Sequence, residues 1–258
     1  MNVIILAGGK GTRSYPFTEF FPKPMMPIGG KPILVHIMEL YASHGFDDFI
    51  IAAGHRKESL FDYFAGRFDE WKVRIVDTGE DADTGERIQR CGDYVNGTFF
   101  ATYGDGVGNV NLTELLAFHR SHGALATVTA VPLRSQYGTI ETDDDGRVLR
   151  FVEKPVLEDH WINAGFFVFD AEVLEVWEGR NLESEVLPAL VSRGELMTYR
   201  HRGFWRSMDT SKDREALEEL FIARTTAWNG VAGNGEGVRL GGARDASVAT
   251  HEGRARLA

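Results

Sequence analysis

The sequence predicts an α/β fold, a Rossmann-like and mostly parallel sheet flanked by helices. Two observations support this prediction. Short apolar runs rich in β-branched residues alternate along the chain with segments in which apolar residues recur at helical spacing. These runs also have the continuous hydrophobicity of strands that are buried on both faces. With 258 residues, of which 43% are hydrophobic, the chain is long enough to bury a core in one domain.

The first half of the chain supplies most of the alternating units. Strands are expected at residues 2–6, 49–53, 73–76, 99–103 and 126–131. Helices are expected between Pro32 and Gly45, around residues 60–64, and at residues 84–92 and 112–122. Repeated strand–helix units of this kind imply right-handed crossovers between parallel strands.

The second half is expected to begin with a small β-hairpin. Residues 138–142 and 147–151 flank an acidic turn at residues 143–146. Beyond it we expect a core strand at residues 162–169 and helices at residues 183–193 and 213–224.

The end of the chain is expected to lie outside the folded domain. From Trp228 onward, seven glycines are scattered among 31 residues with little periodicity. We therefore expect one domain over residues 1–228 and a flexible, glycine-rich tail over residues 229–258.

One stretch organises the expected binding site. The first strand runs directly into Leu6-Ala7-Gly8-Gly9-Lys10-Gly11-Thr12-Arg13, and Phe21-Pro22-Lys23-Pro24-Met25 follows. Residues 7–11, the glycine turn, can expose backbone amides to an anion, because glycine adopts positive φ and lets a ligand approach closely. Arg13 and Lys23 add two cations, and the flanking prolines stiffen the segment around Lys23. A strand, a glycine turn and two cations together indicate a polyphosphate site.

The glycine turn matches neither of two common phosphate motifs. It is not a P-loop, because Lys10 precedes a glycine instead of a Ser or Thr. It is not the dinucleotide fingerprint either, because Ser14 stands where the third glycine is required. A nicotinamide-dependent dehydrogenase is therefore a weak alternative.

The composition indicates a small anionic ligand. The formal net charge of −10 argues against nucleic-acid and anionic-membrane partners. Yet the first 35 residues contain four lysines and arginines and a single carboxylate, Glu19. The single cysteine, Cys91, excludes a disulfide framework, and no apolar run approaches the length of a membrane span. We expect a cytoplasmic location.

Two aspartates are candidate Mg²⁺ ligands. Asp105 follows an apolar strand between two glycines, and in an open α/β sheet the carboxyl ends of strands bind ligands. Asp209 is the second candidate. Each has a structural alternative, Asp105 as a turn residue and Asp209 as a helix N-cap.

Other polar residues could hold an acceptor substrate. Lys154, made rigid by Pro155, suits a second phosphate, and Glu141 and Asn163 could meet sugar hydroxyls. For each, a structural or solvated role is the alternative. No nucleophile motif and no histidine metal spacing is evident. A phosphate monoester needs neither, because it is largely anionic at neutral pH and requires mainly charge neutralisation and alignment.

These motifs, together with Gly104-Asp105-Gly106 and Glu153-Lys154-Pro155, resemble those of the sugar-1-phosphate nucleotidylyltransferases. The resemblance extends over residues 1–228. Within that family the chain looks most like the glucose-1-phosphate cytidylyltransferases. The segments that carry this closer likeness are Val76–Gly79 with Thr84, Gly85 and Arg87, Thr102–Val107, Ile162–Phe167, and Gly203–Trp205 with Met208–Thr210.

The resemblance implies a role for each matching position. Residues 1–132 would form a nucleotide-binding half and residues 133–228 a sugar-binding half. Catalysis would depend on Arg13, Lys23 and Asp105, and Mg²⁺ would be held by Asp105 and Asp209. The nucleotide would contact Leu6, Ala7, Gly8, Gly9, Gly11, Thr12, Thr78, Thr84, Gly85, Arg87 and Gly104. The sugar phosphate would contact Tyr103, Gly138, Glu153, Lys154 and Asn163.

The resemblance leaves the substrates and the assembly open. Cytidylyltransferases of the family usually carry an extra segment before the Val-Asp-Thr-Gly strand, which residues 68–74 replace with a direct connection. Residues 14–22 look more like thymidylyltransferases and related enzymes. The expected reaction joins CTP to glucose-1-phosphate, and the alternatives are dTTP, UTP or GTP with a modified sugar or cyclitol phosphate. A homo-oligomer is expected, and a nucleotide or sugar-phosphate sensor is the non-enzyme alternative.

Overall fold

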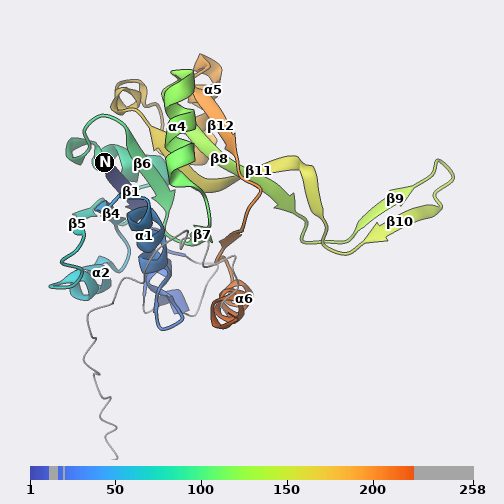
Figure 1. The fold of residues 1–258 in the computed structure, drawn as a ribbon, viewed down its shortest axis with the longest axis horizontal. Helices are drawn as coiled ribbons and strands as arrows, with labels where there is room; N and C mark the ends of the chain where they lie inside the picture. The colour runs from blue at the N-terminus through green and yellow to red at the C-terminus, as the bar shows by residue number, and fades with distance from the viewer. Residues whose placement is uncertain (12–16, 20, 224–258) are drawn as a thin grey trace, which may run out of the picture.

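A seven-stranded mixed sheet forms the centre of the protein, as a computed structural model of residues 1–11, 17–19 and 21–223 shows (Figure 1). The strand order is β12-β8-β11-β6-β1-β4-β5, and only β11 runs against its neighbours. The strands are β1 (Asn2–Leu6), β4 (Asp48–Ala53), β5 (Lys72–Asp77), β6 (Phe99–Tyr103), β8 (Ala126–Arg134), β11 (Val156–Phe169) and β12 (Leu196–Arg200). The predicted fold class is confirmed.

Helices cover both faces of the sheet, and β1 is therefore buried on both faces. Val3 and Ile5 point into one apolar cluster and Ile4 and Leu6 into another. The first cluster also takes side chains from α1 (Ile33–Ser43), α2 (Lys57–Phe64), α4 (Leu112–His122) and α6 (Ser211–Ile222). The second takes them from α3 (Thr84–Arg90), η5 (Ala171–Val176), η6 (Leu182–Val186) and α5 (Leu187–Arg193). In the described part of the chain, no helix is both long and apolar enough to cross a bilayer.

Several elements differ from the prediction. The helix expected at residues 183–193 begins as a π-helical turn, η6, and only then continues as α5. The helix expected at residues 84–92 ends at Arg90, and the 3₁₀ turn η4 (Gly92–Tyr94) follows. Strand β12 was not predicted, and neither were the short strands β2 (Pro27–Ile28), β3 (Lys31–Pro32), β7 (Gly106–Gly108) and β13 (Trp205–Ser207). The expected domain boundary at residue 228 and the tail at residues 229–258 lie outside the described residues.

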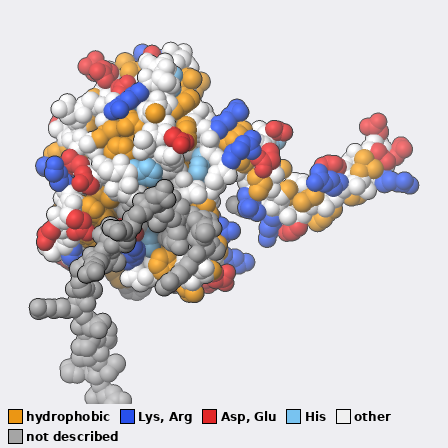
Figure 2. All heavy atoms as spheres, in the orientation of Figure 1, with side chains coloured by type: hydrophobic (Ala, Val, Ile, Leu, Met, Phe, Trp, Pro, Cys, Tyr) orange, Lys and Arg blue, Asp and Glu red, His pale blue; other side chains and the backbone are white. Residues whose placement is uncertain are grey.

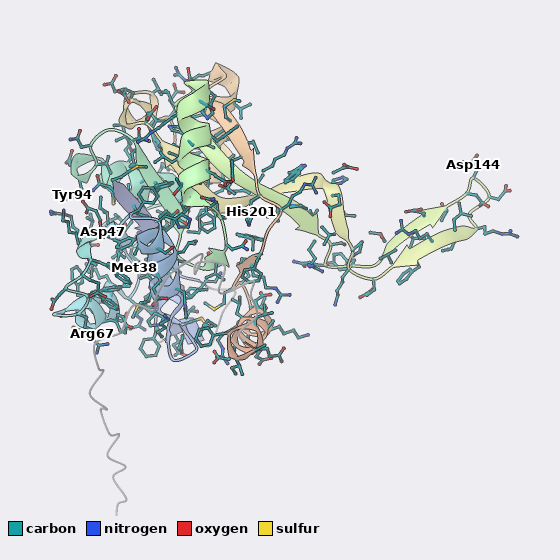
Figure 3. The ribbon with its side chains drawn as sticks, in the orientation of Figure 1. Met38, Asp47, Arg67, Tyr94, Asp144 and His201 are labelled. Carbon is teal, nitrogen blue, oxygen red and sulfur yellow. The ribbon has the colours of Figure 1, made fainter. Side chains whose placement is uncertain are left out.

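The predicted hairpin is present as an arm that projects from the body (Figure 1). Its antiparallel strands are β9 (Thr139–Thr142) and β10 (Val148–Val152), and Asp144 lies near its tip (Figure 3). The space-filling view shows hydrophobic and charged side chains side by side along the arm (Figure 2). Ile140 and Phe151 pair across the strands and are 58% and 61% exposed. A two-stranded hairpin of this size has little stability of its own in water.

Helix α6 is docked on the turn between β2 and β3. Gly29 N–H donates to Glu218 Oε2 at 3.0 Å, and the ring of Phe221 lies directly over Gly29. A Cβ at Gly29 would lie 2.0 Å from a ring carbon, and Gly29 has φ +59°. The turn therefore requires glycine, both for its backbone conformation and for its contact with α6. Because α6 begins two residues after Asp209, this contact also anchors the segment that carries Asp209.

We predict that Gly29→Ala lowers the free energy of unfolding by about 2–4 kcal/mol, from strain at positive φ and overpacking against Phe221. Gly30→Ala is the matched control, because Gly30 has φ +82° but a Cβ there would meet nothing within 4 Å. It should lose only about 1 kcal/mol. Urea denaturation measures both, and equal losses would show that the α6 contact is not what requires glycine.

Candidate functional site

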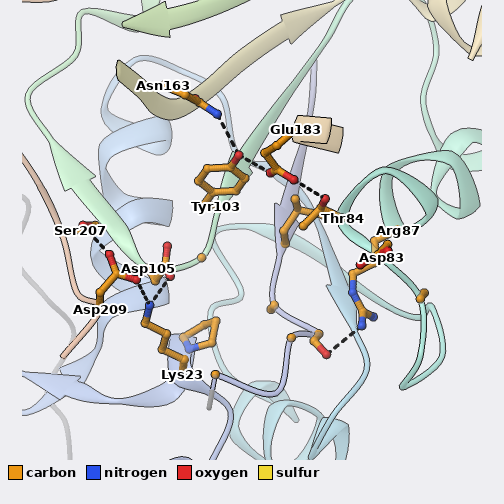
Figure 4. Close-up of a pocket in the computed structure, with 18 of the residues that line it drawn as sticks. Lys23, Asp83, Thr84, Arg87, Tyr103, Asp105, Asn163, Glu183, Ser207 and Asp209 are labelled. Atoms are coloured by element: carbon orange, nitrogen blue, oxygen red, sulfur yellow. Dashed lines mark hydrogen bonds and ion pairs between the residues drawn. The ribbon is translucent and has the colours of Figure 1, made fainter. Parts of the chain in front are cut away.

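A cleft of about 590 Å³ opens at the carboxyl ends of β1 and β6 (Figure 4). Its lining combines backbone of the glycine turn with side chains from both halves of the chain. The residues singled out from the sequence that line it are Leu6, Ala7, Gly8, Gly9, Gly11, Lys23, Thr84, Arg87, Tyr103, Gly104, Asp105, Asn163 and Asp209. Thr12 and Arg13 lie outside the described residues.

Arg87 lies beneath the glycine turn. Its side chain is buried, and its guanidinium donates to the carbonyl oxygens of Gly8 (2.9 Å), Ala53, Gly79 and Glu80 and to Thr78 Oγ1 (2.6 Å). None of these five partners is a carboxylate, and burial lowers the pKa of the guanidinium. The resemblance placed Arg87 near the base and ribose. In the structure Arg87 lines the cleft, and its hydrogen bonds join the glycine turn, the last residue of β4 and the loop after β5, so it fixes the shape of the site.

The three glycines of the turn have different surroundings, which explain in different ways why each position is a glycine. A Cβ at Gly8 would lie 2.1 Å from Arg87 Nη1, so Gly8 makes room for the guanidinium. Gly11 has φ +58° and packs against Thr18 and the Lys23 stem. At Gly9 a Cβ would meet nothing within 4 Å, so this position borders open space in the cleft. All three glycines line the cleft, and two of them also have a packing or backbone reason to be glycine.

Two more of the predicted nucleotide contacts are packing residues here. Thr78 is buried and donates its hydroxyl to Ala53 O at 2.6 Å. Gly85 allows α3 to approach the chain near Arg180, since a Cβ at Gly85 would lie 2.8 Å from the Arg180 carbonyl oxygen. Neither residue lines the cleft.

Lys23 bridges the two candidate metal ligands. Its Nζ lies 2.7 Å from Asp105 Oδ2 and 2.9 Å from Asp209 Oδ1, and only 9% of its side chain is exposed. The segment around Lys23 is a short 3₁₀ turn, η3 (Lys23–Met25), entered through Pro22 and containing Pro24. Figure 4 shows the ammonium group between the two carboxylates.

A backbone contact brings the two aspartates together across the chain. Strand β7 follows Asp105 and pairs antiparallel with β13, which precedes Asp209. Met208 N–H also donates to Asp105 O at 2.9 Å, and Ser207 Oγ donates to Asp209 Oδ2 at 2.9 Å. The carboxylates are therefore held by the fold as well as by Lys23.

The aspartate pair fits a hard divalent cation such as Mg²⁺. Among the described residues, no three His, Cys, Asp or Glu side chains gather into a complete metal cage. Mg²⁺ does not require one, because it is commonly bound by one or two carboxylates together with waters and substrate phosphates. Asp105 and Asp209 supply such a donor set beside the glycine turn.

Glu183 completes a chain of hydrogen bonds that the sequence did not reveal. Its carboxylate accepts from Tyr103 OH and, at 2.8 Å, from Thr84 Oγ1. Asn163 Nδ2 donates to Tyr103 OH at 2.9 Å, so all four side chains are connected along one wall of the cleft (Figure 4). Burial and the neighbouring Glu183 carboxylate raise the pKa of the Tyr103 phenol, which stays protonated and donates. No spacing or motif marks Glu183, which comes from η6.

Three predicted sugar contacts lie at the base of the arm and do not line the cleft. Lys154 is exposed and has φ +48°, and its Nζ lies 3.8 Å from Glu153 Oε1. Gly138 packs under Phe151, because a Cβ there would lie 2.6 Å from the ring. The structure thus separates Gly138, Glu153 and Lys154 from Tyr103 and Asn163.

Comparison with known proteins gives one family match, two relatives and one similar solved structure. A model of the family described as nucleotidyl transferase matches residues 2–220. The chain is 38% identical to a glucose-1-phosphate cytidylyltransferase of Salmonella typhi over 254 residues, covering 88% of this chain and 98% of that protein. It is 36% identical to a UTP–glucose-1-phosphate uridylyltransferase of Synechocystis over 217 residues, covering 75% of this chain and 56% of that protein. The solved structure of HddC from Yersinia pseudotuberculosis shares the fold, with a TM-score of 0.67 at 23% identity over 85% of this chain and 99% of that one.

We predict that Arg87→Lys lowers the free energy of unfolding by about 2–4 kcal/mol, because lysine cannot reproduce the planar fork that holds the loop carbonyls. Arg90→Lys is the control, since the half-exposed Arg90 also donates to a carbonyl of the same segment, Thr78 O. It should cost less than about 1 kcal/mol. Chemical denaturation compares the two variants, and a smaller loss for Arg87→Lys would contradict this role.

Proposed function

Because the chain belongs to the nucleotidyl transferase family, we propose that it transfers the cytidylyl group of CTP to glucose-1-phosphate and releases pyrophosphate. The base and sugar rest on the 38% identity to the Salmonella typhi enzyme, which spans nearly the whole of both chains. The observation that carries the proposal is the meeting, in one cleft, of the glycine turn, Lys23 and the aspartate pair.

The reaction is an in-line displacement at the α-phosphorus. A phosphate oxygen of the sugar phosphate forms the new P–O bond as the bond to the β-phosphate breaks, and pyrophosphate leaves with the electron pair. The attacking phosphate needs no base, because it is largely anionic at neutral pH. Mg²⁺ bound to Asp105 and Asp209 would offset negative charge on the phosphates. Lys23 and the amides of the glycine turn would stabilise and align the same groups.

The wall formed by Tyr103, Asn163, Thr84 and Glu183 is the proposed site for the sugar and ribose hydroxyls. Sugar hydroxyls both donate and accept, and this wall presents both kinds of group. Lys154, Glu153 and Gly138 would join the sugar phosphate only if the base of the arm moves toward the cleft. The tyrosine–glutamate contact belongs to the part of the proposed sugar site that would need no such movement.

Other nucleotides are the second candidate. The Synechocystis relative is a uridylyltransferase by name, and its identity of 36% is close to that of the cytidylyltransferase. The same cleft chemistry applies to UTP, dTTP or GTP, and to a modified sugar or cyclitol phosphate. A sensor that binds nucleotide without chemistry has less support, because Lys23, Asp105 and Asp209 are all in place.

The same proposal includes assembly of several copies through the arm. Ile140, Val148, Leu149 and Phe151 are each more than half exposed. Apolar surface of this extent on a hairpin of marginal stability is typical of a contact surface between chains.

The substrate assignment is tested by a matrix of CTP, UTP, dTTP, GTP and ATP against several sugar-1-phosphates with Mg²⁺. Pyrophosphate release should be fastest with CTP and glucose-1-phosphate. Saturable turnover with UTP or GTP and none with CTP would overturn the cytidylyl assignment and keep the reaction class. Binding without turnover in every combination would favour the sensor.

The site assignment is tested by Lys23→Ala and Asp105→Asn, each of which should lower kcat by about 10²–10³, the scale for losing one preorganised electrostatic group. Lys31→Ala is the control, because Lys31 also pairs with a carboxylate, Glu39, but does not line the cleft. Near-full turnover in the folded Lys23 and Asp105 variants would refute the assignment.

The role of the arm is tested by Phe151→Ser, which removes the largest apolar side chain of its exposed face. The wild type should elute as a multiple of the 28.8 kDa chain in size-exclusion chromatography with light scattering, and the variant as a single chain. Val191→Ser, at a similarly exposed residue of α5, should leave the mass unchanged. A monomeric wild type would refute assembly, and an unchanged Phe151→Ser oligomer would refute the role of the arm.

A further inference from the structure

The Lys23 ammonium and a metal ion would compete for the same oxygen atoms. Nζ lies 2.7 Å from Asp105 Oδ2 and 2.9 Å from Asp209 Oδ1, which are distances of charge-assisted hydrogen bonds. A cation bound between the two aspartates would need those lone pairs and would be repelled by the ammonium in a mostly buried position. The aspartate pair therefore already has a counter-ion in this structure.

The two segments that carry Asp105 and Asp209 are held together by contacts that do not involve Lys23. Pairing of Ser207 with Gly106 and the bond from Met208 N–H to Asp105 O hold their two segments together through the backbone. Ser207 Oγ additionally fixes one oxygen of Asp209. These backbone contacts would keep the two segments side by side in the absence of the ammonium group.

The stem of Lys23 is fixed, but its end can reach more than one partner. The backbone is constrained by Pro22 and Pro24, and the Lys23 Cβ packs against Gly11. Its ammonium group is carried on a flexible four-carbon chain with three donors. The amides and open space of the glycine turn lie in the same cleft. A phosphate bound at the turn would therefore offer Lys23 an alternative anion.

We infer that Lys23 holds the metal position in the nucleotide-free protein, and that a divalent cation binds the aspartate pair only when a triphosphate draws the ammonium group away. This exchange rests on the proposed function, because it assumes that Asp105 and Asp209 bind the metal and that the glycine turn binds phosphate. It makes metal and nucleotide binding mutually dependent, since each must strengthen the other by the same factor. The free enzyme offsets part of the charge of its two carboxylates with Lys23 and does not need to retain a metal.

The test is a titration of the full chain with Mn²⁺ alone, followed by electron paramagnetic resonance and calorimetry, with no nucleotide or sugar present. Wild type should show only weak binding. Lys23→Met, which keeps the stem and removes the charge, should bind Mn²⁺ at least about tenfold more tightly, because the aspartate pair loses its resident cation. Lys31→Met is the matched control: it removes a lysine that pairs with a glutamate, Glu39, outside the cleft, and it should bind as weakly as wild type.

Thermal melting gives a second readout that does not depend on tight binding. MgCl₂ should raise the Tm of Lys23→Met and leave that of wild type unchanged, relative to NaCl of equal ionic strength. Lys23→Gln provides a second neutral variant if Lys23→Met does not fold. If neither variant folds, the Mn²⁺ titration of the wild type is the deciding measurement. Tight binding without nucleotide overturns the exchange, and weak binding supports it.

Two results would overturn the inference. One is equal Mn²⁺ affinity in wild type and a folded Lys23 variant. The other is tight Mn²⁺ binding by the wild type in the absence of nucleotide. Neither depends on turnover. Failure of the CTP and glucose-1-phosphate assay would remove the proposed function and leave the Mn²⁺ comparison to be judged separately.

Discussion

One buried guanidinium holds together the loops from which the cleft is built. Arg87 reaches from α3 to the carbonyl oxygen of the last residue of β4 and to carbonyl oxygens that follow β1 and β5, so three neighbouring strand ends share one donor group. The carbonyl oxygens of Gly8 and Ala53 also accept the backbone N–H groups of His55 and Thr78, so the guanidinium adds to backbone hydrogen bonds that already join these strand ends. Because the cation is fixed by neutral partners, its charge also favours anions above the glycine turn. Support of the backbone and attraction of the ligand thus come from the same side chain.

The second half of the chain contributes to the cleft, at the carboxyl ends of the strands, through short contacts. Strand β13 pairs with β7, and η6 places Glu183 against Tyr103. Both contacts join residues far apart in sequence, and both lie on the wall of the cleft. The cleft is consequently lined by residues from the first half of the chain, between Leu6 and Asp105, and from the second, between Asn163 and Asp209.

Much of the fold could be predicted from the sequence because the central strands are strongly apolar. Helix α4 is found at the predicted residues, since Leu112, Leu115 and Leu116 give it one apolar face and Gly123 ends it. Strand β12 was missed because three of its five residues are exposed. The hairpin itself is local and was predicted. Its projection from the body was not, because it depends on where β8 and β11 extend beyond the sheet.

The candidate site was predictable where residues follow strand ends. Asp105 and the glycine turn meet because parallel strands end at one edge of the sheet. Arg87 was noticed, but its position beneath the turn requires the neighbouring loops. Glu183 and the Lys23 bridge between the aspartates could not be foreseen from spacing, because both depend on contacts between distant segments.

The π-helical turn η6 carries Glu183, so the geometry of this turn matters for the site. Its wide turn holds one more residue than an α-helical turn, and such turns recur at functional sites. Deleting a single residue between Leu182 and Val186 would close this wide turn into an α-helical one, and the residues on either side would keep nearly their former directions, because a π-helical turn absorbs one extra residue locally. Deleting a residue from the regular helix α5 would instead rotate the two sides of the deletion by about 100° about the helix axis. The wide turn thus makes this segment, which carries Glu183, more tolerant of a change in residue number than the helix that follows it.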